Sequence, residues 1–327
     1  MKPHAILFSC LFLASVPANP LLTVARAADA TSLFSPIESP LRLPSEMATL
    51  GNMHGDIAIS KDGRVFVSVG GGPRPGIQVY SPAGDYLHNL PKYNHDFHGF
   101  VISEDEEGEY IIGVPSDGQS VIKMRLDGSE VLRLGADKFD GKLKRLTCVV
   151  VAPDGRIFAA DGYGNDLIHV FDKQGTYVRS FGGREAPYRF KTCHKLVVDT
   201  RFDEPRLLCC DRENRRMVIL TLEGEVLGEI ADMKRPAAVT IHGDLAVVGE
   251  IEGRVSFLDK DGKRVNTLGQ NDTPGEVATN QVAPAKWRPG VFTAPHGVAL
   301  DQAGNLFVAE YNVHGRVLKF TAASESN

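Results

Sequence analysis

Three histidines stand in similar sequence surroundings and are the residues of this chain best suited to bind a metal ion. They are His98, His194 and His296, found in FHGFVI, CHKLVV and APHGVA. Each opens a short apolar run of the kind that forms a β-strand. Three neutral imidazoles that leave a coordination position open are typical of a catalytic zinc site, and they also suit related divalent ions. We therefore expect a divalent metal, zinc first, at these side chains.

The surroundings of these histidines recur along the chain as an imperfect repeat. Aligning the histidine position through all copies gives steps of about 43 to 59 residues, the range of a four-stranded propeller blade. The six aligned residues are Gly55, His98, Thr147, His194, Ala237 and His296. The histidines occupy alternate copies, and alternate blades of a six-fold ring are related by about 120°. The sequence thus predicts an all-β, six-bladed β-propeller in which three imidazoles converge on the axis.

The third copy shows the strand pattern most clearly. Apolar runs of four to six residues alternate with turn residues such as Pro-Asp-Gly, and this pattern favours β-hairpins over helices. We expect its four strands near residues 149–151, 157–160, 167–171 and 176–181.

The two ends of the repeat region indicate how the ring closes. The sixth copy lacks an outer strand, because only seven residues follow the run at 315–320. We expect the segment 41–50 to supply it, since an N-terminal strand that completes the last blade removes the open sheet edges. The propeller would then span 41–327, preceded by a linker at 28–40. An insertion at about 270–292 holds the single tryptophan and is expected to lie over one face as a lid.

Loops on the face of the histidines carry further candidates. Tyr163 lies in the loop of copy three and could act as a general base, since a nearby cation lowers the pKa of a phenol. Arg212 lies in the corresponding loop of copy four and could hold a carboxylate through paired hydrogen bonds. Asp161, Asp211 and Glu310 end the preceding strands, and we expect them to brace neighbouring blades or to orient the histidines.

The N-terminus and the overall charge restrict the setting of the protein. Residues 1–27 resemble a signal peptide, with an apolar run too short for a stable membrane anchor and a small-x-small cleavage pattern. We expect a secreted or periplasmic protein without a membrane anchor. The formal charge of −5 includes no basic stripe, so nucleic acid is not an expected partner. An oxidising compartment permits disulfides, but spacing alone leaves the pairing of Cys148, Cys193, Cys209 and Cys210 open.

The repeat resembles the NHL family of propellers and, more closely, the lyases that cleave peptidyl-α-hydroxyglycine into a peptide amide and glyoxylate. The resemblance covers nearly all of residues 50–320 and is carried by the three histidine contexts, a D-G-Y-x-N loop at 161–165 and a D-R-E-N-x-R loop at 211–216. It implies a zinc ion on the three histidines, Tyr163 as the base and Arg212 beside the substrate.

Two departures from those lyases concern substrate and calcium. Their further substrate-binding arginine, at the end of the second strand of the first blade, is matched here by Gly70, which leaves Arg74 as a candidate substitute. Their aspartate after the last histidine, which helps to hold a structural calcium, is matched by Gly297. That replacement weakens the case for calcium.

The residues together favour an exported metal-dependent lyase that cleaves a hydroxyglycine-type C–N bond in a peptide or a small molecule. The same centre could instead activate water, as in a metal-dependent hydrolase. A third interpretation is a non-catalytic NHL propeller that binds a protein or glycan and carries a structural metal, because fold does not fix function. The sequence leaves open the substrate, the identity of the metal and the oligomeric state.

Overall fold

The short apolar runs of the repeat form the expected β-strands in the computed structural model. In the third copy these are β10 (Cys148–Val151), β11 (Ile157–Ala160), β12 (Leu167–Phe171) and β13 (Tyr177–Gly182), all antiparallel. The turn between β10 and β11 needs the backbone freedom of Gly155, whose φ is +87°. Strand pairing in this copy is therefore confirmed.

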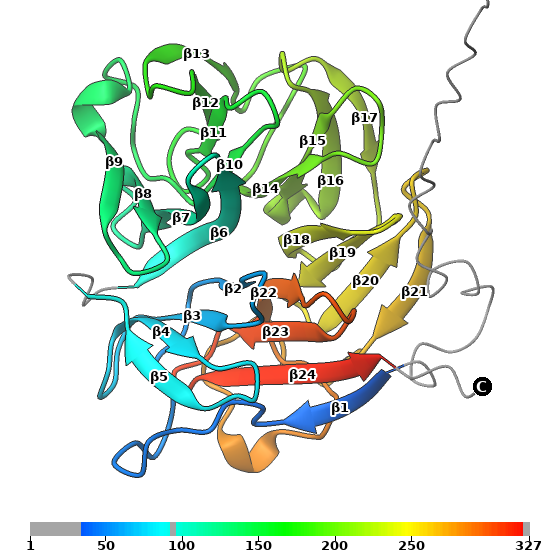
Figure 1. The fold of residues 1–327 in the computed structure, drawn as a ribbon. Coiled ribbons are helices and arrows are strands. Elements are labelled where there is room, and N and C mark those ends of the chain that lie inside the picture. The colour runs from blue at the N-terminus through cyan, green and yellow to red at the C-terminus, as the bar shows by residue number, and fades with distance from the viewer. Residues whose placement is uncertain (1–33, 92–95, 323–327) are drawn as a thin grey trace, which may run out of the picture.

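The structure describes residues 34–91 and 96–322, which form a ring of six four-stranded blades (Figure 1). We number the blades by the order of their inner strands. Blade one contains β2 (Ile57–Ile59), β3 (Val65–Val69), β4 (Gly76–Tyr80) and β5 (Tyr86–Asn89). Blade two contains β6 (Phe97–Asp105), β7 (Gly108–Pro115), β8 (Ser120–Arg125) and β9 (Glu130–Gly135). Blade three consists of β10 to β13. The predicted six-bladed β-propeller is thus confirmed. The predicted signal peptide, residues 1–27, lies outside the described residues.

Blades four to six continue the same order from the inner strand outward. Blade four contains β14 (Cys193–Asp199), β15 (Arg206–Asp211), β16 (Arg216–Thr221) and β17 (Val226–Ile230). Blade five contains β18 (Pro236–His242), β19 (Leu245–Glu250), β20 (Arg254–Leu258) and β21 (Arg264–Leu268). Blade six contains β22 (Pro295–Leu300), β23 (Leu306–Glu310), β24 (Arg316–Ala322) and, as its outer strand, β1. Inner strands of neighbouring blades contact one another all round the ring. Within the described ranges, no helix is long and apolar enough to cross a membrane.

The strand that closes the ring is β1 (Phe34–Glu38), which pairs antiparallel with β24 (Figure 1). An N-terminal strand thus completes the last blade, as expected. The segment assigned to this role from sequence, 41–50, is wrong, and the closing strand lies instead within the predicted linker 28–40. Phe34 stacks on Phe257 at a ring-centre distance of 5.7 Å, so an apolar contact with blade five helps to fix this strand.

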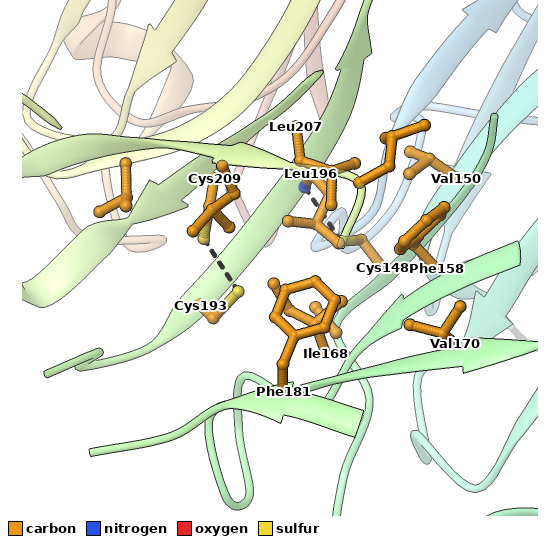
Figure 2. Close-up of a cluster of buried hydrophobic side chains, with 14 of the residues drawn as sticks. Cys148, Val150, Phe158, Ile168, Val170, Phe181, Cys193, Leu196, Leu207 and Cys209 are labelled. Atoms are coloured by element: carbon orange, nitrogen blue, oxygen red, sulfur yellow. Dashed lines mark hydrogen bonds between the residues drawn. The ribbon is translucent and has the colours of Figure 1, made fainter. Parts of the chain in front are cut away.

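The hydrophobic core lies between neighbouring blades. Between blades three and four it includes Phe158 and Leu196 and the side chains of Cys148, Cys193 and Cys209 (Figure 2). Cys148, Cys193, Cys209 and Cys210 are all buried as free thiols, and the sulfur atoms of Cys193 and Cys209 lie 2.9 Å apart. Burial raises the pKa of these thiols, to about 12 for Cys148. Cys193 is thus a core residue.

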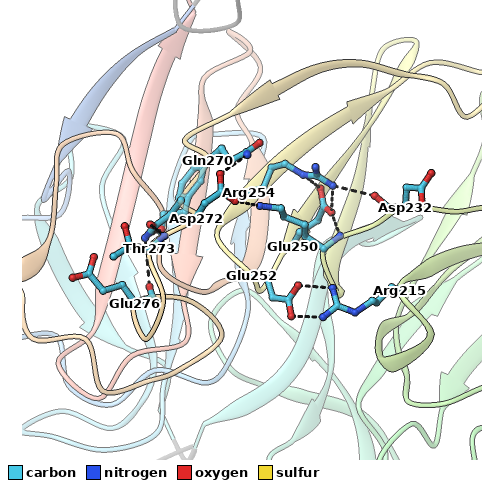
Figure 3. A network of polar contacts seen from close by, with 12 residues as sticks. Arg215, Asp232, Glu250, Glu252, Arg254, Gln270, Asp272, Thr273 and Glu276 are labelled. Carbon is cyan, nitrogen blue, oxygen red and sulfur yellow. Dashed lines mark hydrogen bonds and ion pairs between the residues drawn. The ribbon is translucent and has the colours of Figure 1, made fainter.

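The insertion 270–292 contains one short 3-10 helix, η5 (Pro284–Lys286). It is tied to blade five by an ion pair between Lys234 and Asp272 (Figure 3). Within the insertion, Ala278 packs against a buried cluster formed by Ala237, Ile251 and Ala294, next to the inner strands of blades five and six. One part of the insertion therefore borders the histidine face. Its expected role as a lid remains a prediction.

Candidate functional site

Each of the three predicted histidines is the extra residue of a β-bulge on an inner strand. In blade two, Phe97 and Gly99 pair with consecutive residues of β7, and His98 between them has no partner in the sheet. His194 and His296 take the same place in β14 and β22. A bulge bends its strand and re-aims the side chain of the extra residue. The three bulges thus direct the imidazoles out of their sheets.

The three imidazoles lie together at the axis. Their ring centres are 5.0 Å apart for His98 and His194, 5.1 Å for His98 and His296, and 4.9 Å for His194 and His296. Two imidazoles on one zinc ion at a tetrahedral angle have ring centres about 5 Å apart, given a Zn–N bond of 2.0–2.1 Å. The spacing of the rings therefore suits a shared metal ion.

Backbone carbonyls of the next blade set the tautomer of two of these rings. Nδ1 of His98 is 2.7 Å from the carbonyl oxygen of Thr147, and Nδ1 of His194 is 2.7 Å from that of Ala237. A carbonyl oxygen only accepts, so Nδ1 donates and Nε2 keeps its lone pair for a ligand. Burial lowers the pKa of both histidines well below its ordinary value. Both rings are therefore neutral at pH 7, the form that binds metals.

His296 provides the test of whether a metal fits. It is 2% exposed, and neither of its ring nitrogens has a hydrogen-bond partner in the described structure. Burial, together with the neighbouring His54 and His98, lowers the pKa of His296 well below its ordinary value. A buried nitrogen without a partner is costly unless something else binds it. A metal ion would meet that need, and the residues present fit it.

His54, one place before the aligned position of blade one, also belongs to this cluster. Its ring centre is 4.9 Å from those of both His98 and His296. One ligand nitrogen from each of these three residues can be chosen so that all lie within 4.8 Å of one another. Burial, assisted by Arg212, lowers the pKa of His54 to about 4. The sequence signal was its place next to Gly55, the aligned position of blade one.

The Tyr163 hydroxyl lies between two of the histidines. It is 3.1 Å from Nε2 of His98 and 3.2 Å from Nε2 of His194. The loop can come this close because Gly162 has no side chain, since a Cβ there would lie 2.0 Å from the carbonyl oxygen of Cys193. The structure therefore brings the candidate base to the lone pairs that would face a metal.

Two arginines flank the Tyr163 ring. Arg212, in the 3-10 helix η4 (Arg212–Asn214), donates to the Tyr163 hydroxyl at 3.2 Å and to Glu213 at 3.0 Å. The guanidinium carbons of Arg212 and Arg145 are each 5.4 Å from the centre of the Tyr163 ring. Arg145 is exposed and was not identified from the sequence, because it lies outside the repeated loop position. Together they place two positive charges beside the phenol.

The three predicted acids hold the chain that leads into the inner strand of their own blade. The backbone donors are Lys144 and Arg145 for Asp161, Lys191 for Asp211, and Thr293 and Ala294 for Glu310. Glu250 does the same in blade five, where it accepts from the backbone of Lys234 and pairs with Arg254 (Figure 3). Asp211 and Glu310 thus position His194 and His296 through the backbone, whereas Asp161 and Glu250 belong to blades without a site histidine. The hydrogen bonds that orient the rings of His98 and His194 come from carbonyls instead.

The structure does not bring Arg74 to the histidines. Its guanidinium pairs with Glu46, donates to the Tyr86 hydroxyl at 3.0 Å and lies 4.9 Å from the centre of the Tyr86 ring. Tyr86 is on β5, the outer strand of blade one. At Gly70 a Cβ would meet Asp96 at 2.6 Å, so no side chain takes the place of the expected arginine. Arg145 is the second guanidinium near the site.

The residues around Gly297 do not fit a calcium ion. A Cβ at Gly297 would lie 3.0 Å from the carboxylate of Asp56. That carboxylate is already paired with the ammonium of Lys195, and both side chains are buried. Calcium needs six to eight oxygen ligands. The Lys195 ammonium supplies no oxygen and, as a cation, would repel a calcium ion beside Asp56. We therefore assign no role to calcium.

Fold and site together define a six-bladed β-propeller with a histidine cluster on its axis, and part of its sequence is similar to that of an amidating lyase. Over 197 residues the chain is 29% identical to peptidyl-α-hydroxyglycine α-amidating lyase 2 of Drosophila melanogaster. The match covers 55% of this chain and 44% of that protein, so the chain spans less than half the length of this relative. No protein-family model matches the chain.

Solved structures support the fold independently. A streptogramin B lyase has a TM-score of 0.60 at 14% identity, over 90% of this chain and 100% of that one. Virginiamycin B lyase from Staphylococcus aureus has a TM-score of 0.57 at 14% identity, over 89% and 100% of the two chains. At this identity the similarity concerns the fold alone.

Proposed function

We propose that this chain is an exported, metal-dependent lyase that cleaves the C–N bond of a hydroxyglycine-type peptide or small molecule. The observation that carries the proposal is the place of the Tyr163 hydroxyl, within 3.2 Å of Nε2 of two histidines and of the Arg212 guanidinium. The partial sequence similarity to an amidating lyase supports the choice of substrate.

His98, His194 and His296 would hold the metal, with zinc as the first candidate because all three donors are neutral nitrogens. When bound, zinc would polarise the substrate hydroxyl and stabilise the negative charge that develops on its oxygen. The carbonyls of Thr147 and Ala237 keep two of the Nε2 atoms deprotonated for this purpose.

Tyr163 would move the proton. As the general base, its oxygen would take the proton of the substrate hydroxyl. The electron pair of that O–H bond forms the C=O of glyoxylate, and the C–N pair leaves with the amide nitrogen. Tyr163 then returns the proton to that nitrogen, so atoms and charge balance without water. Arg212 would bind the substrate carboxylate and fix the orientation of the C–N bond.

The test is release of glyoxylate from a synthetic α-hydroxyglycine peptide by the zinc-loaded protein. Tyr163→Phe should lower kcat by about 100-fold or more, the usual contribution of a general base, while it retains its zinc. Tyr177→Phe makes the same change on the outer strand β13 and should leave both kcat and zinc content unaltered.

Each result has a distinct meaning. Zinc bound by wild type but absent from a His98→Ala/His194→Ala double variant supports the metal site. A zinc-loaded wild-type protein that releases no glyoxylate would contradict the lyase proposal and favour a metal centre with a hydrolytic or structural role.

A further inference from the structure

Blade one contributes to the histidine cluster in a way that the repeat does not explain. Its residue at the aligned position is Gly55, where a Cβ would lie 2.4 Å from the carbonyl oxygen of Phe97. No side chain can therefore reach the axis from that position. His54, one residue earlier, supplies an imidazole to the same space, 4.9 Å from the rings of His98 and His296.

The backbone next to His54, in blade one, is held by hydrogen bonds to blade six, where the ring closes. Met53 and Asn312 form a two-bond antiparallel bridge, with N–O distances of 2.9 and 3.1 Å. The bridge also places Tyr311 beside His54, with ring centres 4.5 Å apart. Contacts between blades one and six therefore hold this imidazole in a defined place, as a metal ligand requires.

The spacing of His54 matches that of the other rings. Its distances to His98 and His296 equal the shortest distance among the three bulge histidines, 4.9 Å. Its ligand nitrogen lies within 4.8 Å of those of His98 and His296. His54 therefore meets the criterion of about 5 Å between imidazoles on one zinc with His98 and with His296.

We propose that His54 is a fourth ligand of the metal ion held by His98, His194 and His296. This inference rests on the proposed metal site. With four imidazoles present, the substrate oxygen would enter as a fifth ligand, an expansion that catalytic zinc sites undergo. The site would then differ from a three-histidine centre that keeps one position free.

The experiment compares wild type with His54→Phe, which keeps an aromatic ring against Tyr311 and removes the ligand nitrogens. Zinc affinity is measured by competition with a chromophoric chelator, and the ligand field by the visible spectrum of the Co²⁺-substituted protein. We expect His54→Phe to lower zinc affinity by about tenfold or more, since even indirect partners of zinc ligands change affinity by 10–100-fold. The Co²⁺ bands should also shift.

The control is His88→Phe, the same change at an exposed histidine of the outer strand β5. It should leave affinity and spectrum as in wild type. His54→Ala guards against a folding defect specific to phenylalanine and should reproduce the loss, with unfolding of the metal-free protein as the check on folding. Unchanged affinity and spectrum in both His54 variants, with wild type binding one zinc, would overturn this inference alone. Absence of zinc from wild type would overturn the metal site as well.

Discussion

The ammonium of Lys195, in blade four, forms a buried ion pair with the carboxylate of Asp56, which directly precedes the inner strand of blade one. The two side chains are 7% and 5% exposed. Asp56 also accepts the backbone N–H of Phe100 at 3.1 Å. Blades one and four lie opposite each other in a six-bladed ring, so the pair spans the channel. Burial lowers the pKa of Lys195, but the Asp56 carboxylate and nearby thiols raise it more.

Removing the lysine should destabilise the fold. Lys195→Met leaves the Asp56 carboxylate buried without a counter-charge, and breaking such a pair costs about 3–5 kcal/mol. Urea unfolding of the metal-free protein measures this loss. The double variant Asp56→Asn/Lys195→Met should be more stable than Lys195→Met alone, because it has no buried charge at this place. A single variant within about 1 kcal/mol of wild type would contradict a structural role for the pair.

Calcium should not stabilise the protein. The Lys195 ammonium already neutralises Asp56, and Gly297 adds no carboxylate. We expect the same Tm for zinc-loaded protein in millimolar calcium and in a calcium-selective chelator. A Tm that rises with calcium concentration would show a cation site that this pairing does not account for.

Loss of the Arg212 guanidinium should weaken substrate binding and turnover. A charge-assisted hydrogen bond contributes about 1.5–3 kcal/mol, so Arg212→Gln should lower kcat/KM for a hydroxyglycine peptide by about 10- to 150-fold. Arg215→Gln is the matched control, because Arg215 is on the same loop but pairs with Glu252 at 2.6 Å (Figure 3).

Arg145→Gln should act mainly on KM. Arg145 is exposed and lies over the Tyr163 ring, whereas Arg212 donates directly to the Tyr163 hydroxyl. We therefore expect Arg145 to attract the substrate carboxylate and not to take part in the proton transfer. For a substrate whose carboxylate is replaced by a neutral amide, KM should be the same in Arg145→Gln and in wild type. An equal loss for charged and neutral substrates would show that Arg145 does not bind the anion.

Stability of the metal-free protein should fall steeply as the pH drops below about 6.5, the ordinary pKa of histidine. Burial lowers the pKa of His98, His194 and His296 in the folded state, so the unfolded chain binds more protons in this range. Their contribution is therefore complete above pH 6.5 and is lost as the pH falls towards the folded-state pKa. Between the folded-state and unfolded-state pKa values, each histidine lowers the free energy of unfolding by about 1.4 kcal/mol for each pH unit of acidification.

Urea unfolding at about pH 7.5 and 5.5 tests this linkage. His194→Gln should reduce the pH dependence by the share of one histidine, and His88→Gln, at an exposed site, should not. An unchanged dependence in His194→Gln would mean that this imidazole is not held neutral by the fold.

The sequence predicted those features that depend on local pattern. Short apolar runs separated by turn residues define the strands of each blade, and a repeat of blade length defines the ring. Because symmetry converts spacing along the chain into position around the axis, His98, His194 and His296 could be placed together from sequence. Tyr163 and Arg212 followed from the repeat as well, since their loops end equivalent strands.

The features that the sequence could not show depend on contacts between distant segments. Arg74 is drawn to Glu46 and Tyr86, whereas Arg145 reaches the Tyr163 ring from outside the repeated position. The closing strand at 34–38 is chosen by its pairing with β24 almost 300 residues later, and a five-residue edge strand carries little local signal.

The sequence by itself determined the number of blades, because the copies of the repeat can be counted along the chain. It also determined the face that carries the chemistry, because the histidines occupy the same place within each copy. Tertiary structure alone decided how that face is built. The bulges that turn the histidines inward form where two strands of one blade pair. The bridge between Met53 and Asn312 beside His54 and the ion pair between Asp56 and Lys195 require the ring to be closed. Ring closure brings together groups that are far apart in the sequence. Their interaction depends on distance and burial, and local sequence patterns predict neither.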